Sequence, residues 1–185
     1  LINLPAFGIV MLITWLLLRG ARESARANTI MVVIKLAVLA LFIGVGVMNL
    51  NPDNYTPFAP NGFTGIHQGA AIVFFAYIGF DAISTAAEET RNPQRNLPIG
   101  ILGGLAICTL IYVVVGAVIT GMVPYTELGV ADPLARALEL IGYTGVSTIV
   151  AFGAAVSMAA VLLVFQYGQP RIFFAMARDG LLPEW

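Results

Sequence analysis

The stretch "AYIGFDAISTAAEETRNPQRNLP", residues 76–98, begins as an apolar run typical of a membrane helix and ends as a charged loop. Gly79 and Asp81 stand inside its apolar part. A glycine within a helix costs about 1 kcal/mol relative to alanine, and an aspartate at the centre of a membrane helix costs roughly 2.5–3.5 kcal/mol. Together the two residues favour a helix that is interrupted near Ile78, Gly79 and Phe80.

The composition is that of a protein whose solvent is largely lipid. The chain of 185 residues is 59% hydrophobic and 10% charged, whereas soluble domains carry about 25% charged residues. The formal net charge of −1 gives no basic stripe for nucleic acid. A single cysteine, Cys108, and a single histidine, His67, leave no internal disulfide and no metal site to expect. The opening "LINLPAFGIVML" starts within hydrophobic sequence, so we expect a piece of a longer polypeptide.

A hydrocarbon core about 30 Å thick needs roughly 20 apolar residues of helix. Five stretches predict spans, the first together with the residues before it: 4–18, 29–50, 69–87, 97–123 and 145–177. The expected fold class is therefore an all-α integral membrane protein with a discontinuous third span. Arginines gather in the loops on one side of these spans: Arg19, Arg22, Arg26, Arg91, Arg95, Arg171 and Arg178. Because the opposite loops hold only Arg136, the arginine-rich loops are predicted to face the cytoplasm.

Between the last two spans, "ADPLARALELIG" predicts a short helix over 132–142. Asp132 is a suitable N-cap, and Pro133 suits the first helical position. The apolar residues fall on one face, which predicts an amphipathic helix on the outer interface; a solvated loop helix is the alternative. Within the spans, Gly100 with Gly104 and Gly153 with Ser157 have the spacing that lets helix backbones approach closely.

An interruption near Gly79 has a chemical consequence. The backbone carbonyls before it, those of Phe75, Ala76 and Ile78, lose their intrahelical donors, and Asp81 becomes the N-cap of a second half-helix. Free carbonyls cannot face lipid and must line an enclosed or watery cavity. An ammonium group suits such carbonyls, and interrupted helices form the substrate sites of many secondary transporters. The residues leave one alternative open, an unbroken helix whose Asp81 bonds to a neighbouring helix.

At this level of detail the sequence resembles a known family. "FFAYIGFDAISTAAEETRNPQRNLPIGI" resembles the sixth helix and following loop of the amino acid–polyamine–organocation (APC) transporters. "SARANTIMVVIKLAVLALFIGVG" is similar to the fifth helix of their cationic amino acid transporter branch, and "QPRIFFAMARDGLLP" to the end of its eighth. The resemblance covers essentially the whole chain. It implies helices four to eight of a twelve-helix transporter with the LeuT-like inverted repeat.

The resemblance also implies site residues. The backbone carbonyls of Phe75, Ala76 and Ile78 would bind the substrate amine, and Asp81 would lie near the substrate side-chain pocket. The family binds the substrate carboxylate through its first helix, which is outside this chain. Whether the substrate is a cationic or a small neutral amino acid therefore stays open.

Lys35 is the residue that the resemblance implies for proton coupling. In proton-coupled relatives a lysine on this helix takes the place of sodium, and Ser157 is its candidate partner on the eighth helix. Burial disfavours the charged form of a lysine, which would allow proton release during the cycle. The alternative is a lysine whose amine reaches the cytoplasmic interface as an anchor.

The sequence thus predicts a secondary active amino acid transporter in the cell membrane, driven by a proton gradient and using no cofactor. It has no phosphate loop or nucleophile elbow, so we do not expect an enzyme. The expected partners are an amino acid, the lipid bilayer and the remaining helices of the same transporter, with a small membrane protein as a further candidate. A non-transporting accessory subunit and a sodium-coupled or exchange-type amino acid or polyamine transporter are the alternatives.

Overall fold

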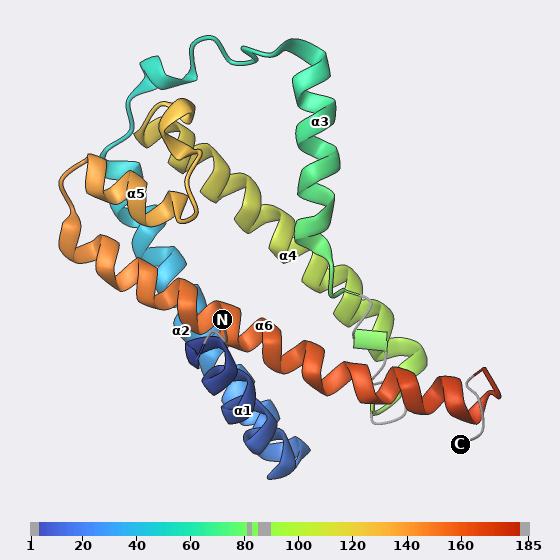
Figure 1. The fold of residues 1–185 in the computed structure, drawn as a ribbon. Coiled ribbons are helices and arrows are strands. Elements are labelled where there is room, and N and C mark those ends of the chain that lie inside the picture. Colours follow the sequence, from blue (N-terminus) through green and yellow to red (C-terminus); the bar gives the residue numbers. More distant parts are fainter. Residues whose placement is uncertain (1–3, 81–82, 85–89, 182–185) are drawn as a thin grey trace. The chain divides into compact units, whose positions relative to one another are not determined.

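The computed structural model describes residues 4–80, 83–84 and 90–181, and within these ranges its regular structure is entirely helical (Figure 1). The α-helices are α1 (Leu4–Leu18), α2 (Ala21–Met48), α3 (Gly62–Phe74), α4 (Pro93–Met122), α5 (Pro133–Leu140) and α6 (Thr144–Arg178). Short 3-10 helices are η1 (Pro52–Tyr55), η2 (Phe75–Tyr77) and η4 (Tyr125–Leu128). The chain forms two compact units: residues 1–33, 79–102 and 156–185 make the first, and residues 34–78 and 103–155 make the second.

The helices carry most of their apolar side chains on the outside. Three of the described helices are long and apolar enough to cross a membrane, namely residues 23–48 of α2, α4 and α6. Only 6% of the most apolar window of α4 is buried. Helices with so little of their apolar surface covered need lipid or further helices around them, which agrees with an all-α membrane protein.

The expectation of five spans is therefore met only in part. The stretches predicted over 29–50, 97–123 and 145–177 are continuous long helices in the structure. The first predicted span is the 15-residue α1, about 22 Å long and shorter than a hydrocarbon core. The third predicted span, over 69–87, corresponds to the 13-residue α3, which begins earlier, at Gly62, and ends at Phe74.

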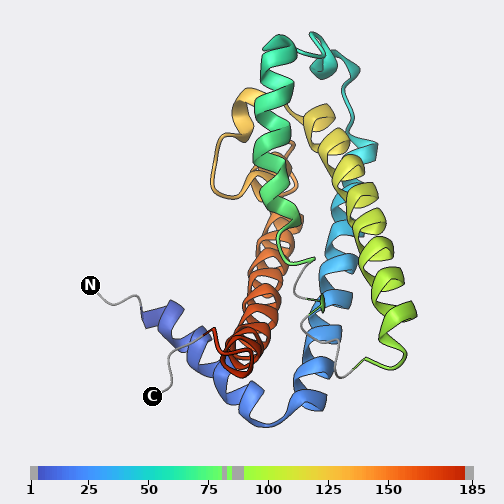
Figure 2. The same ribbon diagram turned by 90° about the vertical axis from the view of Figure 1, so that its right-hand side faces the viewer.

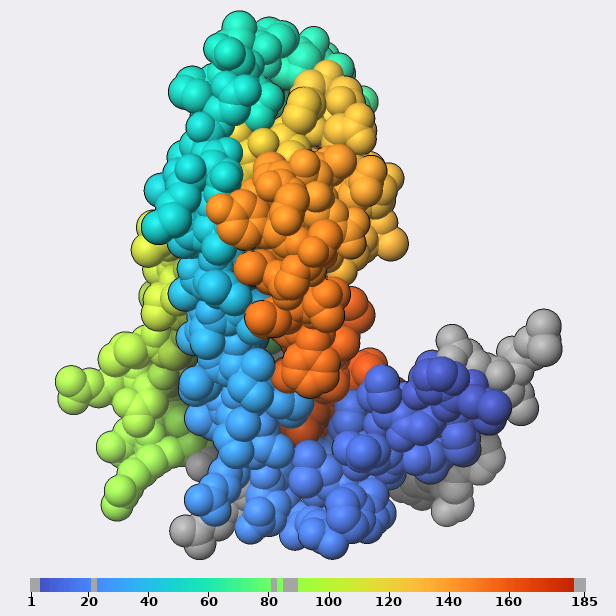
Figure 3. Space-filling view, turned by 90° about the vertical axis from the view of Figure 1, so that its left-hand side faces the viewer, coloured from blue at the N-terminus to red at the C-terminus, as the bar shows by residue number. Residues whose placement is uncertain are grey.

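In the second unit the core forms where α5 packs beside the ends of the longer helices. Its fully or nearly fully buried members are Phe42, Val118, Ile119, Met122, Val123, Ala137, Leu138 and Val150. Figure 3 shows the start of α6 and its neighbouring residues, in orange, against the last turns of α2, in light blue. The loop after α2 joins this packing, since the Tyr55 hydroxyl donates to the Ala117 carbonyl at 2.7 Å.

The short helix predicted after α4 is present as α5. Asp132 caps α5 as expected, with its side chain accepting from the Ala135 N–H. Its apolar face, however, lies inside the protein, where Ala137 and Leu138 are completely buried. This face packs against the ends of α2, α4 and α6, and the placement of the helix on the outer interface stays a prediction.

α4 begins four residues before the predicted span over 97–123. The helix begins at Pro93, and the N–H groups of Arg95 and Asn96 both donate to the Asn92 carbonyl. Proline at the first helical position loses no hydrogen bond, so the helix starts before Asn96. Pro98 lies within its second turn.

One of the two predicted small-residue pairs makes a close helix contact. A Cβ placed on Gly153 of α6 would come within 2.7 Å of Val38 Cγ1 on α2, so only glycine fits there. Gly100 and Gly104 of α4 have nothing within 4 Å of such a Cβ in the described part of the chain. The Gly153 contact belongs to the second unit and brings α2 and α6 together one helical turn from Lys35.

Candidate functional site

The interruption that the sequence predicts near Gly79 is present. α3 ends at Phe74, η2 continues as one 3-10 turn, and Ile78 then takes an extended conformation with φ −57° and ψ 131°. Gly79 follows with φ +114°, a backbone conformation that side-chain-bearing residues rarely adopt. Figure 2 shows the ribbon leaving its helical path at the end of α3. Asp81, predicted as the cap of a second half-helix, lies outside the described residues.

The three carbonyls predicted to bind an amine have different surroundings. The Phe75 carbonyl accepts a weak bond from the Ile78 N–H at 3.3 Å. The Ala76 carbonyl accepts from the Tyr112 hydroxyl at 2.9 Å. No donor from the described residues reaches the Ile78 carbonyl. Because each carbonyl oxygen has two lone pairs, all three retain acceptor capacity.

Two tyrosines and a threonine hold this turn against α4, and the sequence reasoning did not single them out. The Tyr77 and Tyr112 rings meet edge to face with their centroids 5.2 Å apart. The Tyr77 hydroxyl lies 3.0 Å from Thr109 Oγ1. Thr109 and Tyr112 are three residues apart, so they share one face of α4. Hydroxyls at this spacing in an otherwise apolar helix are the signal that could have indicated the contact.

The apolar side chains at the interruption lie on the outside of the unit. Phe75 is 68% exposed and Ile78 is 54% exposed. Over its described residues, 75–80, the turn offers backbone oxygens and the Tyr77 hydroxyl as its polar groups. The described residues contain no group of three or more histidines, cysteines, aspartates or glutamates that could hold a metal ion.

The two predicted coupling residues are on different helices. Lys35 lies at the middle of the 28-residue α2 with its side chain exposed. Ser157 lies half-buried on α6, four residues after Gly153. Lys35 belongs to the second compact unit and Ser157 to the first.

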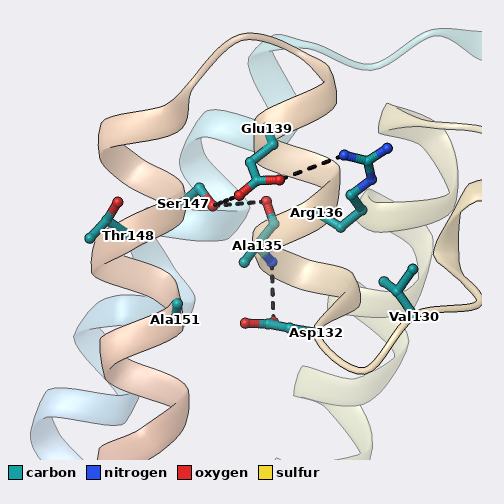
Figure 4. A pocket seen from close by; sticks show the side chains of 8 residues that line it. All are labelled: Val130, Asp132, Ala135, Arg136, Glu139, Ser147, Thr148 and Ala151. Atoms are coloured by element: carbon teal, nitrogen blue, oxygen red, sulfur yellow. Dashed lines mark hydrogen bonds and ion pairs between the residues drawn. The ribbon is translucent and has the colours of Figure 1, made fainter.

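A second polar feature is an open recess of about 410 Å³ between α5 and α6 (Figure 4). The buried Ser147 hydroxyl reaches the Ala135 carbonyl at 3.0 Å and Glu139 Oε1 at 3.4 Å. Glu139 also pairs with Arg136 at 3.7 Å. These polar groups bond to one another. The exposed pair between Arg136 and Glu139 contributes at most about 1 kcal/mol to stability. The arrangement ties α5 to the start of α6.

A comparison with known protein families identifies the family of this chain. The model of the family described as amino acid permease matches residues 2–185, nearly the whole chain. The chain belongs to the amino acid permease family. It is accordingly a multi-pass membrane protein, and its relatives are permeases and transporters, not enzymes, as the sequence led us to expect.

The names of individual relatives in this family give different substrates. The chain is 50% identical to the branched-chain amino acid permease BcaP of Bacillus subtilis over 99% of its length, and 49% identical to the methylthioribose transporter of the same organism over 98%. It is 42% identical over 99% of its length to cationic amino acid transporter 9, chloroplastic, of Arabidopsis thaliana. The matched region is 40%, 39% and 32% of those three proteins, in that order. The chain thus spans about two fifths of its bacterial relatives.

Proposed function

We propose that this chain is part of a secondary active amino acid transporter that works by alternating access around the interruption after α3. The observation that carries the proposal is the remaining acceptor capacity of the Phe75, Ala76 and Ile78 carbonyls after the end of α3, in a member of the amino acid permease family. By the bacterial relatives, its location is the cell membrane.

The proposed site binds the α-ammonium group of the substrate. Its ligands are the backbone carbonyls of Phe75, Ala76 and Ile78, at the negative end of the α3 dipole. An ammonium has three donors, one for each of these carbonyls. Asp81 is proposed near the substrate side chain. The carboxylate of the amino acid is bound by helices outside this chain, as in the family that the sequence resembles.

Gly79 supplies the freedom that alternating access needs. A residue that adopts φ +114° without strain allows the segments before and after it to change direction independently. Hinges of conformational change are typically a few such residues at the ends of elements.

Proton coupling is proposed for Lys35, with Ser157 as its helix-eight partner. The support is the resemblance, in which a lysine of this helix takes the place of sodium, together with the exposed Lys35 side chain six residues after Thr29, where the predicted span begins. The close contact between Gly153 and Val38 lies one turn away, where the α2 and α6 backbones approach.

Two other substrates or couplings compete with this proposal. The 49% identity to a methylthioribose transporter favours a neutral thio-sugar, a molecule without an ammonium group, as the second candidate. Sodium coupling or plain exchange keeps the amino acid but removes the role of Lys35. A small membrane-protein partner and a non-transporting accessory role are further candidates.

Uptake into proteoliposomes separates these candidates. The full-length protein is reconstituted, and uptake of radiolabelled leucine, valine, arginine, lysine and methylthioribose is measured with an imposed proton gradient, with a sodium gradient and with neither. We expect accumulation of at least one amino acid that requires the proton gradient. Uptake of methylthioribose and of no amino acid would make methylthioribose the substrate. No uptake of any compound would favour the accessory subunit.

Lys35→Ala tests the coupling. We expect loss of accumulation driven by the proton gradient, with exchange of substrate across the membrane retained. Lys35→Arg is the matched variant, because arginine keeps the positive charge but holds its proton; it too is expected to exchange without accumulating. Undiminished accumulation by Lys35→Ala would make Lys35 an anchor and the coupling assignment wrong.

A further inference from the structure

Within the described part of the chain, the Ala76 carbonyl has no N–H donor from its own helix and accepts a hydrogen bond from a residue of α4. In a continuous α-helix this oxygen would accept from the N–H four residues later, but the chain leaves the helical path at Ile78. The Tyr112 hydroxyl, 36 residues away in the sequence, donates to it at 2.9 Å instead. One of the two lone pairs of this carbonyl is therefore occupied before any ligand arrives.

The neighbouring hydroxyls have a defined donor order. Thr109 Oγ1 donates to the Leu105 carbonyl of its own helix at 2.8 Å. Its single proton is thereby committed, so in the 3.0 Å contact with Tyr77 the tyrosine is the donor. Tyr77 and Tyr112 thus form two tethers between η2 and α4, of which only the Tyr112 tether reaches a proposed substrate ligand.

We propose that Tyr112 is a positioning residue for the substrate amine. By holding one lone pair of the Ala76 carbonyl, its hydroxyl fixes the plane of this peptide group and leaves the second lone pair for the ammonium. Without the hydroxyl the oxygen can rotate away with its peptide group, and the amine must then order it on binding, which weakens affinity. The inference rests on the proposed function, since it concerns the same three carbonyls.

Tyr112→Phe removes the hydroxyl and keeps the ring that packs against Tyr77. A matched control exists in Tyr55→Phe, which removes a tyrosine hydroxyl that likewise donates to a backbone carbonyl, that of Ala117 at 2.7 Å. Each substitution removes one hydrogen bond that involves α4: the Tyr112 hydroxyl donates from α4, and the Tyr55 hydroxyl donates to it. Only Tyr112→Phe removes a bond at the interruption. Thr109→Val is a second control, because it releases Tyr77 and leaves the Ala76 carbonyl bonded.

The experiment measures KM and maximal rate for uptake of radiolabelled leucine and arginine by the full-length protein in proteoliposomes, with the melting temperature of each variant. For whichever amino acid the parent transports, we expect Tyr112→Phe to raise KM roughly 3- to 10-fold, the range for one net hydrogen bond, with little change in maximal rate. Tyr55→Phe and Thr109→Val are expected to keep the parent KM. The melting temperatures report any loss of stability separately from KM.

Three results would overturn the inference. An unchanged KM in Tyr112→Phe would leave the hydroxyl with a purely structural role, as would a KM that rises equally in all three variants. A lowered KM would mean that the hydroxyl competes with the amine for the carbonyl. If the parent itself takes up neither amino acid but takes up methylthioribose, the proposed function fails before Tyr112 is tested, and the two failures are distinguishable.

Discussion

α4 contacts its neighbours in two chemically different ways within the second unit. Toward its C-terminal end, Val118, Ile119 and Met122 are buried in an apolar core with residues of α2 and α5. Nearer its middle, Thr109 and Tyr112 meet the turn after α3 through hydroxyl groups, while Phe75 in that turn is 68% exposed. The C-terminal end of the helix is packed, and its middle is tethered.

The difference separates stability from function. A packed contact consists of many small dispersion terms, so removing a buried side chain leaves a cavity and destabilises the fold. A tethered contact depends on single hydrogen bonds, each worth about 1 kcal/mol net. Substitutions in the core should therefore lower stability, whereas loss of the Tyr112 tether or of the Gly79 backbone conformation should alter transport in a protein that still folds.

The largest expected effect is in the core. Leu138→Ala removes a completely buried side chain of α5 and should lower the free energy of unfolding by about 2–5 kcal/mol. Leu140→Ala is the matched control, because Leu140 on the same helix is 42% exposed. Thermal or denaturant unfolding of the purified full-length protein measures both. Equal losses in the two variants would show that the core does not extend to α5.

A smaller effect on stability, with a large effect on transport, is expected at the interruption. Gly79→Ala meets no steric obstacle, since nothing lies within 4 Å of the added Cβ. Its cost is the backbone conformation alone, about 1–3 kcal/mol for a residue held in a sparsely populated region. Uptake should fall while the protein remains folded, as measured by transport rate and melting temperature together.

Gly116→Ala is the control for this substitution. Gly116 lies inside α4 and also has open space around its added Cβ, but alanine is favoured over glycine in a helix. Transport by this variant should match that of the parent. A Gly79→Ala protein that transports at the parent rate would remove the link between the interruption and function.

The smallest expected effect is at the cap of α5. Asp132 accepts from the Ala135 N–H at 3.3 Å, and its replacement by alanine should cost about 1 kcal/mol. Asp132→Asn keeps a capping oxygen and should restore most of that loss. Unfolding measurements on the three proteins check the order, with uptake expected to be unchanged. A loss as large as that of Leu138→Ala would mean that α5 depends on its cap more than on its packing.

Much of the fold followed from local patterns in the sequence. The long apolar runs predicted α2, α4 and α6 to within a few residues at most ends, and Asp132 was recognised as a cap from its place before Pro133. The start of α4 was placed too late because two prolines, Pro93 and Pro98, both fit the first turn of a helix. Which of them occupies it depends on the Asn92 carbonyl, which accepts from the N–H groups that follow Pro93.

The sequence by itself determined the lipid environment and the position of the interruption. Both depend on intrinsic properties of single residues, namely the solvation of apolar side chains and the backbone freedom of Gly79. Only the tertiary structure decided that the apolar face of α5 is buried in protein, and that Tyr112 donates to the Ala76 carbonyl. These contacts join segments far apart in the chain, so the partner of each group depends on how the helices pack.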